Sequence, residues 1–330
     1  MKDILHYLYS YQTLTKEQAK EILQNISLKK YNEIQIASFL TVFSMRSITV
    51  DEMNGFVEAL KENCIKVNLD GYDTIDMCGT GGDGKNTFNI STIASFVVAG
   101  AGIHIAKHGN YGVSSGCGSS NLMESLGYTF STDSSKLQSD LEKAGMCYMH
   151  APLFHPTMKE VAPIRKQLIV RTFFNMAGPL VNPANPAAQS VGVYNLEVGR
   201  IYKYLFQNNN KQFIIIHALD GYDEISLTGE VKLMSNNFET IVTPFDFNCS
   251  PTTPNQIDGG SSVEDAVRIC MNILQNSANQ AQTEVVLANA AIGIKSIRQH
   301  QTIEECMFQA RESLESGRAL GVLRKLQSIQ

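Results

Sequence analysis

The sequence predicts an α/β protein, with a small helical domain and a larger domain built around a mainly parallel central sheet. At 330 residues the chain is longer than one hydrophobic core usually serves. Its beginning carries the spacing and capping of helices, whereas the rest alternates short apolar runs with glycines and helical stretches. We therefore expect a helical domain over residues 1–66, with a returning segment near 160–186, and an α/β domain over residues 67–330.

The N-terminal helices are predicted from three capping boxes, in which Ser, Thr or Asn is followed three residues later by Glu or Gln. The boxes are Thr15 to Gln18, Asn32 to Gln35 and Thr49 to Glu52. Each one precedes apolar residues at helical spacing. The three boxes thus predict three helices in the small domain.

The α/β domain is predicted from apolar runs that read as strands between helical stretches. Between residues 152 and 186 six prolines crowd together, which is typical of connections and helix edges, so we expect the chain to cross back between the domains there. The runs are Thr74 to Met77, Ile103 to Ala106, Phe213 to His217 and Glu284 to Ala288.

Composition excludes several classes of protein. The net charge is -5 and the charges are scattered, so nothing indicates a nucleic-acid partner. The first residues lack the pattern of a signal peptide, and the most apolar segment, Ile93 to Ile105, is too short to span a membrane. The seven cysteines include no C-x-x-C pair. We expect a cytoplasmic protein with reduced thiols and no membrane contact.

A glycine-rich loop, Gly79 to Gly84, follows a predicted strand and precedes a helix that begins near Ser91. Such a loop suits phosphate, because glycines let the backbone approach closely and a helix N-terminus offers unpaired N–H donors. A tight strand-to-helix turn is the ordinary alternative. Four glycines within six residues favour phosphate binding.

The loop also matches two other phosphate motifs, and the surrounding residues argue against both. The dinucleotide fingerprint G-x-G-x-x-G requires an acidic residue at the end of the second strand, where this chain has Lys107. The P-loop pattern requires Ser or Thr where this chain has Asn86, and Asp83 would place an anion in the phosphate cradle. We interpret both matches as coincidental.

Downstream residues complete the predicted anion site. Asn89 or Ser91 alone would be interpreted as an N-cap. Together with the loop, we expect them to surround a space of the size of an anion. Lys107 ends a predicted strand, which is where α/β folds place ligands. We expect it to contact phosphate.

The runs CGTGGDG, NIST, KHGN, HPTMK, RTFFNMAGPLVNPA and DGYDEISLTG, in this order, resemble the anthranilate phosphoribosyltransferase family. The resemblance spans the whole chain and is densest from residue 76 to 232. It implies a fold of the nucleoside phosphorylase and anthranilate phosphoribosyltransferase type, with the active site in the cleft and homodimers formed through the helical domain. It also implies a place in tryptophan biosynthesis and the use of Mg²⁺, with two ions per monomer.

The resemblance further assigns roles to individual residues. The implied metal ligands are Ser91, Asp223 and Glu224. The implied anthranilate-binding residues are Gly79, His108, Asn110, Arg165 and Gly178. The implied residues that bind phosphoribosyl pyrophosphate (PRPP) are Gly79, Gly82, Asp83, Thr87, Asn89, Ile90, Ser91, Thr92, Lys107, Gly109, Asn110, Ser114, Ser115 and Ser119.

Three of these side chains also have a physical rationale. Magnesium prefers hard oxygen ligands and is usually shared between one or two carboxylates and the phosphates of a substrate, which fits Asp223 and Glu224. A solvated acidic turn is the ordinary reading of such a pair. The guanidinium of Arg165 matches the carboxylate of anthranilate in bidentate fashion, although an isolated Arg is usually a surface residue.

Four positions depart from the family pattern. Tyr111 stands where Arg is usual, and Cys117, Ser120 and Asn121 stand where Ser, Ala and Asp are more usual. A cationic contact in this loop is therefore missing or replaced. The retained Lys, Asn and Ser residues favour an active enzyme.

The implied reaction is attack by the amine of anthranilate on C1 of the ribose, which displaces pyrophosphate without a covalent enzyme nucleophile. Catalysis is then mainly electrostatic stabilisation and alignment. A pyrimidine nucleoside phosphorylase is the first alternative, disfavoured by the acidic pair Asp223 and Glu224. Nucleic-acid-binding relatives without transferase activity are the second, disfavoured by the acidic net charge.

Overall fold

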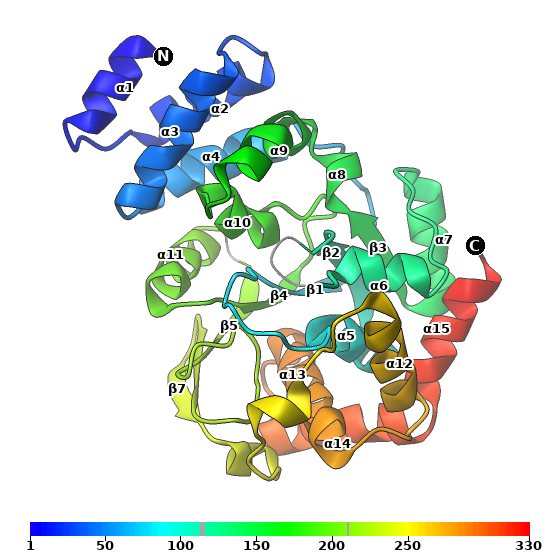
Figure 1. Cartoon of the computed structure of the whole chain (residues 1–330). Helices are drawn as coiled ribbons and strands as arrows, with labels where there is room; N and C mark the ends of the chain where they lie inside the picture. Colours follow the sequence, from blue (N-terminus) through cyan, green and yellow to red (C-terminus); the bar gives the residue numbers. More distant parts are fainter. Residues whose placement is uncertain (113–115, 210) are drawn as a thin grey trace. The chain divides into compact units, whose positions relative to one another are not determined.

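The computed structural model describes residues 1–112, 116–209 and 211–330 (Figure 1). The chain forms two compact units. The first comprises Met1–Lys66 and Ala151–Pro183, and the second comprises Val67–His150 and Ala184–Gln330. None of the helices in these described ranges has both the length and the apolar character needed to cross a membrane.

The first unit is helical, and its capping chemistry follows the sequence. All three predicted capping boxes form, with the Thr15, Asn32 and Thr49 side chains each accepting from the backbone N–H three residues on. The elements are α1 (Lys2–Tyr9), α2 (Lys16–Ser27), α3 (Glu33–Met45), α4 (Val50–Glu62), α8 (Ala151–Phe154), α9 (Pro156–Leu168), α10 (Phe173–Ala177) and the 3₁₀ helix η1 (Gly178–Val181).

A cluster of phenylalanines joins the two segments of the helical unit. Phe39 and Phe43 of α3 and Phe56 of α4 meet Phe173 of α10, and the rings of Phe56 and Phe173 stack at 4.1 Å. Aromatic rings bury large apolar surfaces, so this cluster holds the returning segment to the N-terminal helices. As expected, the prolines mark connections and helix edges: Pro152, Pro156 and Pro179 lie at the starts of α8, α9 and η1. Pro163, inside α9, is the exception.

The second unit contains a seven-stranded sheet in the order β3-β2-β1-β4-β5-β6-β7. The first five strands of that order are parallel, and β6 and β7 are antiparallel additions at one edge. The fold class predicted from the sequence is thereby confirmed. The strands are β1 (Thr74–Gly79), β2 (His104–Gly109), β3 (Met146–His150), β4 (Ala188–Gly192), β5 (Gln212–Ala218), β6 (Val231–Ser235) and β7 (Glu239–Val242).

Helices cover this sheet, and one of them corrects a prediction. The run Glu284 to Ala288 was expected to be a strand but lies in α13. That helix is apolar on nearly all sides, so the helical period leaves no signature in a five-residue window. The helices are α5 (Ile90–Gly100), α6 (Ser119–Ser125), α7 (Ser134–Ala144), α11 (Leu196–Gln207), η2 (Pro244–Phe247), η3 (Pro254–Ile257), α12 (Val263–Leu274), α13 (Gln280–Ile297), α14 (Ile303–Glu315) and α15 (Arg318–Ser328).

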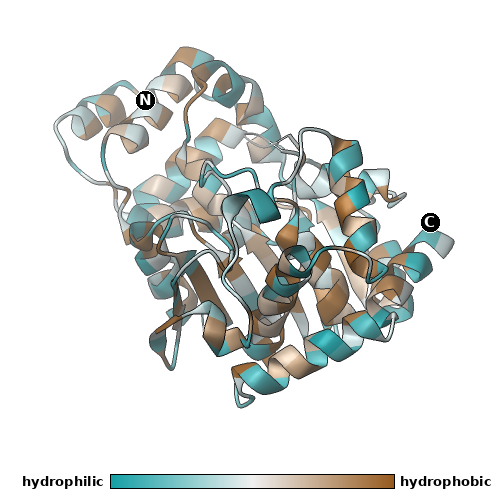
Figure 2. Cartoon of the chain, turned by 60° about the horizontal axis from the view of Figure 1, so that its bottom comes forward, coloured by the Kyte–Doolittle hydropathy of each residue, from teal (hydrophilic) through white to brown (hydrophobic). Residues whose placement is uncertain are grey.

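The core of the second unit lies between the sheet and its helices. Figure 2 shows mostly hydrophobic strands, whereas the outer helices alternate hydrophobic and hydrophilic residues. Three predicted strand runs, Thr74 to Met77, Ile103 to Ala106 and Phe213 to His217, form or overlap β1, β2 and β5. Because β1, β2, β3 and β4 are parallel, the loops that follow them gather at one edge of the sheet.

Candidate active site at the carboxyl edge of the sheet

The glycine-rich loop leaves β1 in a conformation that favours glycine. Gly81, Gly82 and Gly84 have φ values of +63°, +78° and +75°, in the region that side chains with a Cβ rarely adopt. The backbone N–H of Gly81 donates to Oδ2 of Asp223 at 2.7 Å. Two residues 142 positions apart in the sequence are thus brought into direct contact by the loop.

A turn after β5, which we call the acidic turn (residues 220–224), packs against the ends of β1 and β4. A Cβ added to Gly79 would lie 2.5 Å from Oδ2 of Asp223, and one added to Gly192 would overlap the Asp223 carbonyl oxygen. Gly79 and Gly192 are register partners. Glycine at both strand ends therefore creates the space that the acidic turn occupies.

The second carboxylate of the turn reaches the start of α5. Oε1 of Glu224 accepts the backbone N–H of Ser91 at 2.9 Å, at the positive end of the helix dipole. Asp223 is 7% exposed and Glu224 is half-buried. Burial raises the pKa of both carboxyls, and the negative charges of Asp83 and of the pair itself raise these pKa values further.

The structure brings together most of the residues expected around this turn. Gly79, Asp83, Ser91 and both carboxylates of the turn form one cluster. Ile90 and Thr92 are buried on α5, so Ile90 can offer only its backbone to a ligand. Among the described residues no group of three or more His, Cys, Asp or Glu has metal-binding geometry, so the candidate metal site rests on two carboxylates and a serine.

Lys107 of β2 lies inside the sheet edge instead of facing solvent. It is 1% exposed, and its ammonium group donates to the carbonyl oxygen of Met77 on β1. Burial lowers the pKa of its ammonium, while the nearby carboxylate of Asp76 acts in the opposite direction. The neighbouring His108 is also buried, and its backbone N–H donates to Oδ1 of Asp76 at 3.2 Å.

The turn after β2 is arranged around Asn110. Its carbonyl oxygen accepts from the backbone N–H of Ser120 at 3.0 Å and from the hydroxyl of Ser119 at 3.4 Å. Gly109 leaves room for the hydroxyls of Ser119 and Tyr148, since a Cβ there would lie 2.2 Å from each. The predicted residues Ser114 and Ser115 lie outside the described residues.

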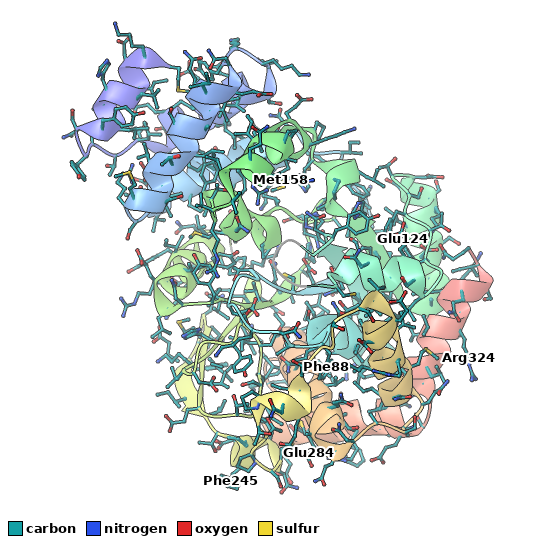
Figure 3. All side chains as sticks on the ribbon, viewed as in Figure 1. Phe88, Glu124, Met158, Phe245, Glu284 and Arg324 are labelled. Atoms are coloured by element: carbon teal, nitrogen blue, oxygen red, sulfur yellow. The ribbon has the colours of Figure 1, made fainter. Side chains whose placement is uncertain are left out.

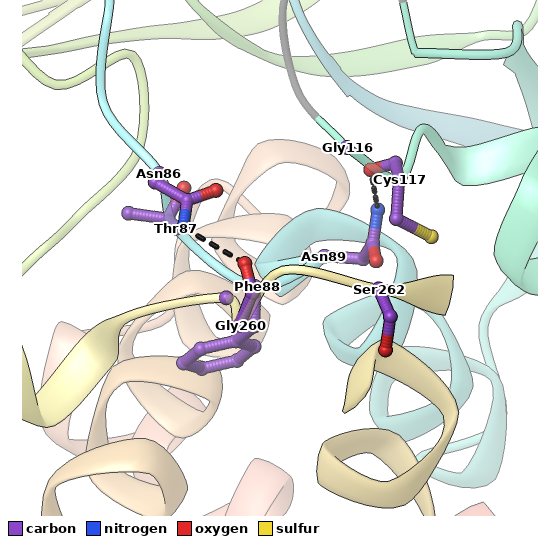
Figure 4. Close-up of a pocket in the computed structure, with 9 residues that line it drawn as sticks. Asn86, Thr87, Phe88, Asn89, Gly116, Cys117, Gly260 and Ser262 are labelled. Atoms are coloured by element: carbon purple, nitrogen blue, oxygen red, sulfur yellow. Dashed lines mark hydrogen bonds between the residues drawn. The ribbon is translucent and has the colours of Figure 1, made fainter. Parts of the chain in front are cut away.

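A small pocket lies between the loop before α5 and residues 259–262, a segment for which the sequence predicts no role (Figure 4). The side chain of Asn89 donates to the Cys117 carbonyl at 3.0 Å instead of capping α5, and Asn86 donates to the Gly260 carbonyl at 2.9 Å. The pocket is lined by Asn86, Thr87, Phe88, Asn89, Gly116, Cys117, Gly259, Gly260 and Ser262.

Asn289 is a second residue that sequence reasoning missed. It is buried on α13, and its amide exchanges two hydrogen bonds with the backbone of Ile225, at 3.1 Å and 2.8 Å. These bonds fix the chain immediately after Glu224. A lone amide within the apolar run VVLANAAIGI was the signal that could have identified it.

The remaining candidates, Arg165 and Gly178, belong to the helical unit. Arg165 on α9 donates to Oδ1 of Asn175 at 3.2 Å, and its guanidinium lies 5.3 Å from the ring centroid of Phe174. Burial lowers its pKa. Gly178 begins η1 with open space where a Cβ would stand.

Comparisons with known proteins agree over the entire chain. Residues 71–320 match the family described as "Glycosyl transferase family, a/b domain", and residues 2–64 match its helical bundle domain. The anthranilate phosphoribosyltransferase of Flavobacterium johnsoniae is 55% identical over 329 residues, which cover 100% of this chain and 99% of that protein.

Two solved structures are similar in fold. The crystal structure of anthranilate phosphoribosyltransferase from Thermus thermophilus has a TM-score of 0.92 at 28% identity and covers 98% of each chain. The Saccharomyces cerevisiae anthranilate phosphoribosyltransferase in complex with PRPP and Mg also has a TM-score of 0.92, at 26% identity, and covers 98% of this chain and 96% of its own.

Proposed function

The chain belongs to the anthranilate phosphoribosyltransferase family, and we infer that it transfers the phosphoribosyl group of PRPP to anthranilate in tryptophan biosynthesis. The products are N-(5-phosphoribosyl)anthranilate and pyrophosphate. The observation that carries this function is the contact of Asp223 and Glu224 with the backbone N–H groups of Gly81 and Ser91. These contacts bring the glycine loop and the start of α5, both suited to anions, next to a pair of carboxylates suited to magnesium.

We propose that PRPP binds along the carboxyl edge of the sheet. The glycine loop allows close backbone approach, the start of α5 supplies the positive end of its helix dipole, and Lys107 of β2 supplies positive charge. The proposed contacts are Gly79, Gly82, Asp83, Thr87, Asn89, Ile90, Ser91, Thr92, Lys107, Gly109, Asn110, Ser114, Ser115 and Ser119.

Magnesium fits the proposed ligands Ser91, Asp223 and Glu224. Two adjacent carboxylates whose pKa values are raised by burial and by each other are stabilised when a cation neutralises them. We propose two ions per monomer, held by Ser91, Asp223 and Glu224 and shared with the phosphates of the substrate. When bound, magnesium supplies positive charge to the pyrophosphate of the substrate.

The protein's own contribution to the reaction is alignment and electrostatics. The amine of anthranilate is neutral at pH 7 and needs no general base before it attacks C1. Its nitrogen bonds to C1 as the C1–O bond to pyrophosphate breaks, and the nitrogen then releases one proton to water. Negative charge then grows on the leaving pyrophosphate, where the ammonium of Lys107 and the positive dipole end of α5 stabilise it. Alignment of amine and C1 supplies the remainder of the rate enhancement.

We propose that anthranilate contacts Gly79, His108, Asn110, Arg165 and Gly178. The carboxylate of anthranilate suits the guanidinium fork of Arg165, which Asn175 and Phe174 hold in place. An arginine held in this way loses little conformational freedom when it binds a carboxylate.

We also propose a cytoplasmic homodimer that forms through the helical unit. Most of the exposed large apolar side chains belong to this unit, although it is the smaller of the two; Tyr11, Ile34, Met45 and Ile169 are each more than 75% exposed. We propose that a second copy of the chain covers these side chains. Light scattering of the purified protein measures the mass directly, and a monomer at micromolar concentration contradicts the dimer.

The function is tested by following the fluorescence of anthranilate as purified protein consumes it with PRPP. We expect turnover that depends on magnesium and stops when a chelator is added. Inorganic phosphate with a pyrimidine nucleoside serves as the alternative substrate pair. Folded protein that does not turn over anthranilate at high magnesium, or that prefers the nucleoside, contradicts the assignment.

A further inference from the structure

Four side chains form a continuous line of hydrogen-bonding groups, which we call the hydroxyl chain: Ser119, Tyr148, Ser120 and His150. The hydroxyl of Ser119 lies 2.8 Å from that of Tyr148, which lies 2.9 Å from the hydroxyl of Ser120. The Ser120 hydroxyl lies 2.8 Å from Nδ1 of His150. Tyr148 and Ser120 are fully buried and His150 is 6% exposed.

The imidazole at the end of the chain is held by two aromatic rings. Phe130 stacks on His150 with ring centroids 4.6 Å apart and an angle of 14° between the planes. The edge of Tyr111 packs against the same imidazole at 4.6 Å, and its hydroxyl lies 3.4 Å from the carboxylate of Glu124 on α6 (Figure 3 labels Glu124). Packing therefore fixes the plane of the imidazole, and the contact with Ser120 places Nδ1.

The hydrogens along this chain can run in two directions, because each hydroxyl has a single hydrogen to donate. When Nδ1 of His150 carries a hydrogen, Ser120 accepts it and donates to Tyr148, which donates to Ser119. The hydrogen of Ser119 then points away from Tyr148. In this structure it goes to the carbonyl oxygen of Asn110 at 3.4 Å, and a bound phosphate oxygen would compete for it. When Nδ1 is bare, all the bonds reverse and Ser119 donates its hydrogen to Tyr148.

Phosphate oxygens at neutral pH only accept hydrogen bonds, so only one of these directions suits them. We propose that His150 is a positioning residue which, through Ser120 and Tyr148, orients the Ser119 hydroxyl so that its hydrogen points to a phosphate oxygen of PRPP. This inference rests on the proposed function, because it takes PRPP as the ligand of Ser119. Ser120 and Tyr111, two positions that depart from the family pattern, both contact His150 and so would act in the same arrangement.

The charge state of His150 is compatible with this role. Burial lowers the pKa of its imidazole, and the carboxylate of Glu124 opposes that effect in part. A neutral imidazole can carry its hydrogen on either nitrogen, so binding of phosphate at Ser119 selects the form with hydrogen on Nδ1. The form with both nitrogens protonated gives the same direction.

The first test compares two substitutions of His150 with opposite hydrogen-bonding capacity, assayed at pH 8. Ionised aspartate only accepts, so His150→Asp forces the wrong direction; its KM for PRPP should rise about tenfold with kcat nearly unchanged. His150→Asn retains an N–H donor and should stay within about twofold of wild type. The matched control is His104→Asn. His104 begins β2, whereas His150 pairs with Gly109 at the other end of that strand, and the ring centroids of His104 and Tyr72 lie 4.8 Å apart.

A double-mutant cycle with Ser120→Ala separates this effect from simple charge repulsion. Repulsion between Asp and phosphate persists without Ser120, whereas an effect carried by the hydroxyl chain disappears. We expect His150→Asp to change the KM by less than about threefold in the Ser120→Ala background. An equal tenfold rise in both backgrounds overturns the proposal.

A second measurement uses the wild-type protein and does not depend on the folding of any variant. Nitrogen-15 NMR of labelled histidine, assigned with His150→Asn, should show a hydrogen on Nδ1 of His150 in the complex with PRPP and magnesium without anthranilate. A bare Nδ1 in that complex overturns the proposal. Absence of wild-type turnover in the fluorescence assay, in contrast, contradicts the proposed function itself.

Discussion

Two regions at the same edge of the sheet differ in charge. The acidic turn places Asp223 and Glu224 close to Asp83, and the carboxylates repel one another. The hydroxyl chain from Ser119 to His150 is neutral, and its members satisfy one another by hydrogen bonds. The first region needs a cation to become stable, whereas the second is complete and only has to be oriented.

This difference indicates how each region contributes to binding. Like charges that are buried together cost free energy, which a bound cation recovers, so the acidic turn couples metal affinity to protein stability. Neutral hydroxyls cost little to bury when they are paired. Substitutions in the acidic turn should therefore change metal dependence and stability together, whereas substitutions in the hydroxyl chain should change mainly the KM for PRPP.

The largest expected effect comes from Asp223→Asn combined with Glu224→Gln. The amide oxygens can still accept from Gly81 and Ser91, so the turn keeps its shape, but the charge that attracts magnesium is gone. We expect magnesium-dependent turnover to fall by about 100-fold or more, because the charge on pyrophosphate is no longer neutralised.

The melting temperature of the same double variant separates metal binding from folding. Without magnesium at pH 8 it should melt above wild type, since the buried repulsion is removed. Wild-type turnover, or a metal-free melting temperature below that of wild type, contradicts the role assigned to the acidic turn.

An intermediate effect is expected for Asn289→Leu, which removes the support of the acidic turn but none of its charge. The backbone N–H and carbonyl of Ile225 would lose their partners, each costing about 1–3 kcal/mol when buried. We expect urea denaturation to show a destabilisation of about 2–4 kcal/mol, together with weaker magnesium activation. Asn272→Leu on α12 is the control. Equal losses of stability and of magnesium activation in the two variants would contradict the role of Asn289 in supporting the acidic turn.

The smallest expected effect is a dependence of stability on pH. The raised pKa values of Asp223, about 7, and Glu224, about 8, mean that the folded protein holds protons that the unfolded chain has released. Their contribution to stability is complete below the ordinary carboxyl pKa of about 4 and is lost as the pH rises through these raised values.

Metal-free wild type should therefore melt lower at pH 9 than at pH 6, by about 2–4 °C for each kcal/mol lost. The Asp223→Asn and Glu224→Gln double variant should show a smaller decrease, and magnesium should stabilise wild type more at pH 8 than at pH 6. Parallel pH profiles for the two proteins would show that other groups dominate.

Local chemistry explains which parts were predictable. The capping boxes at Thr15, Asn32 and Thr49 form as expected, because cap and partner are three residues apart and need no other part of the chain. The Glu284 to Ala288 run was misassigned, because a short apolar segment fits a buried strand or a buried helix equally well.

The sequence by itself determined the fold class, the family and the strand-end loop whose glycines take positive φ, since these depend on residue type and short spacing. Only the tertiary structure decided that Asp223 meets Gly81, that Asn289 holds Ile225, and that Ser119, Tyr148, Ser120 and His150 form one chain. Most of these contacts join residues distant in sequence, and hydrogen bonds require fit within a few tenths of an ångström. Strand order and register set that fit, and no local pattern encodes it.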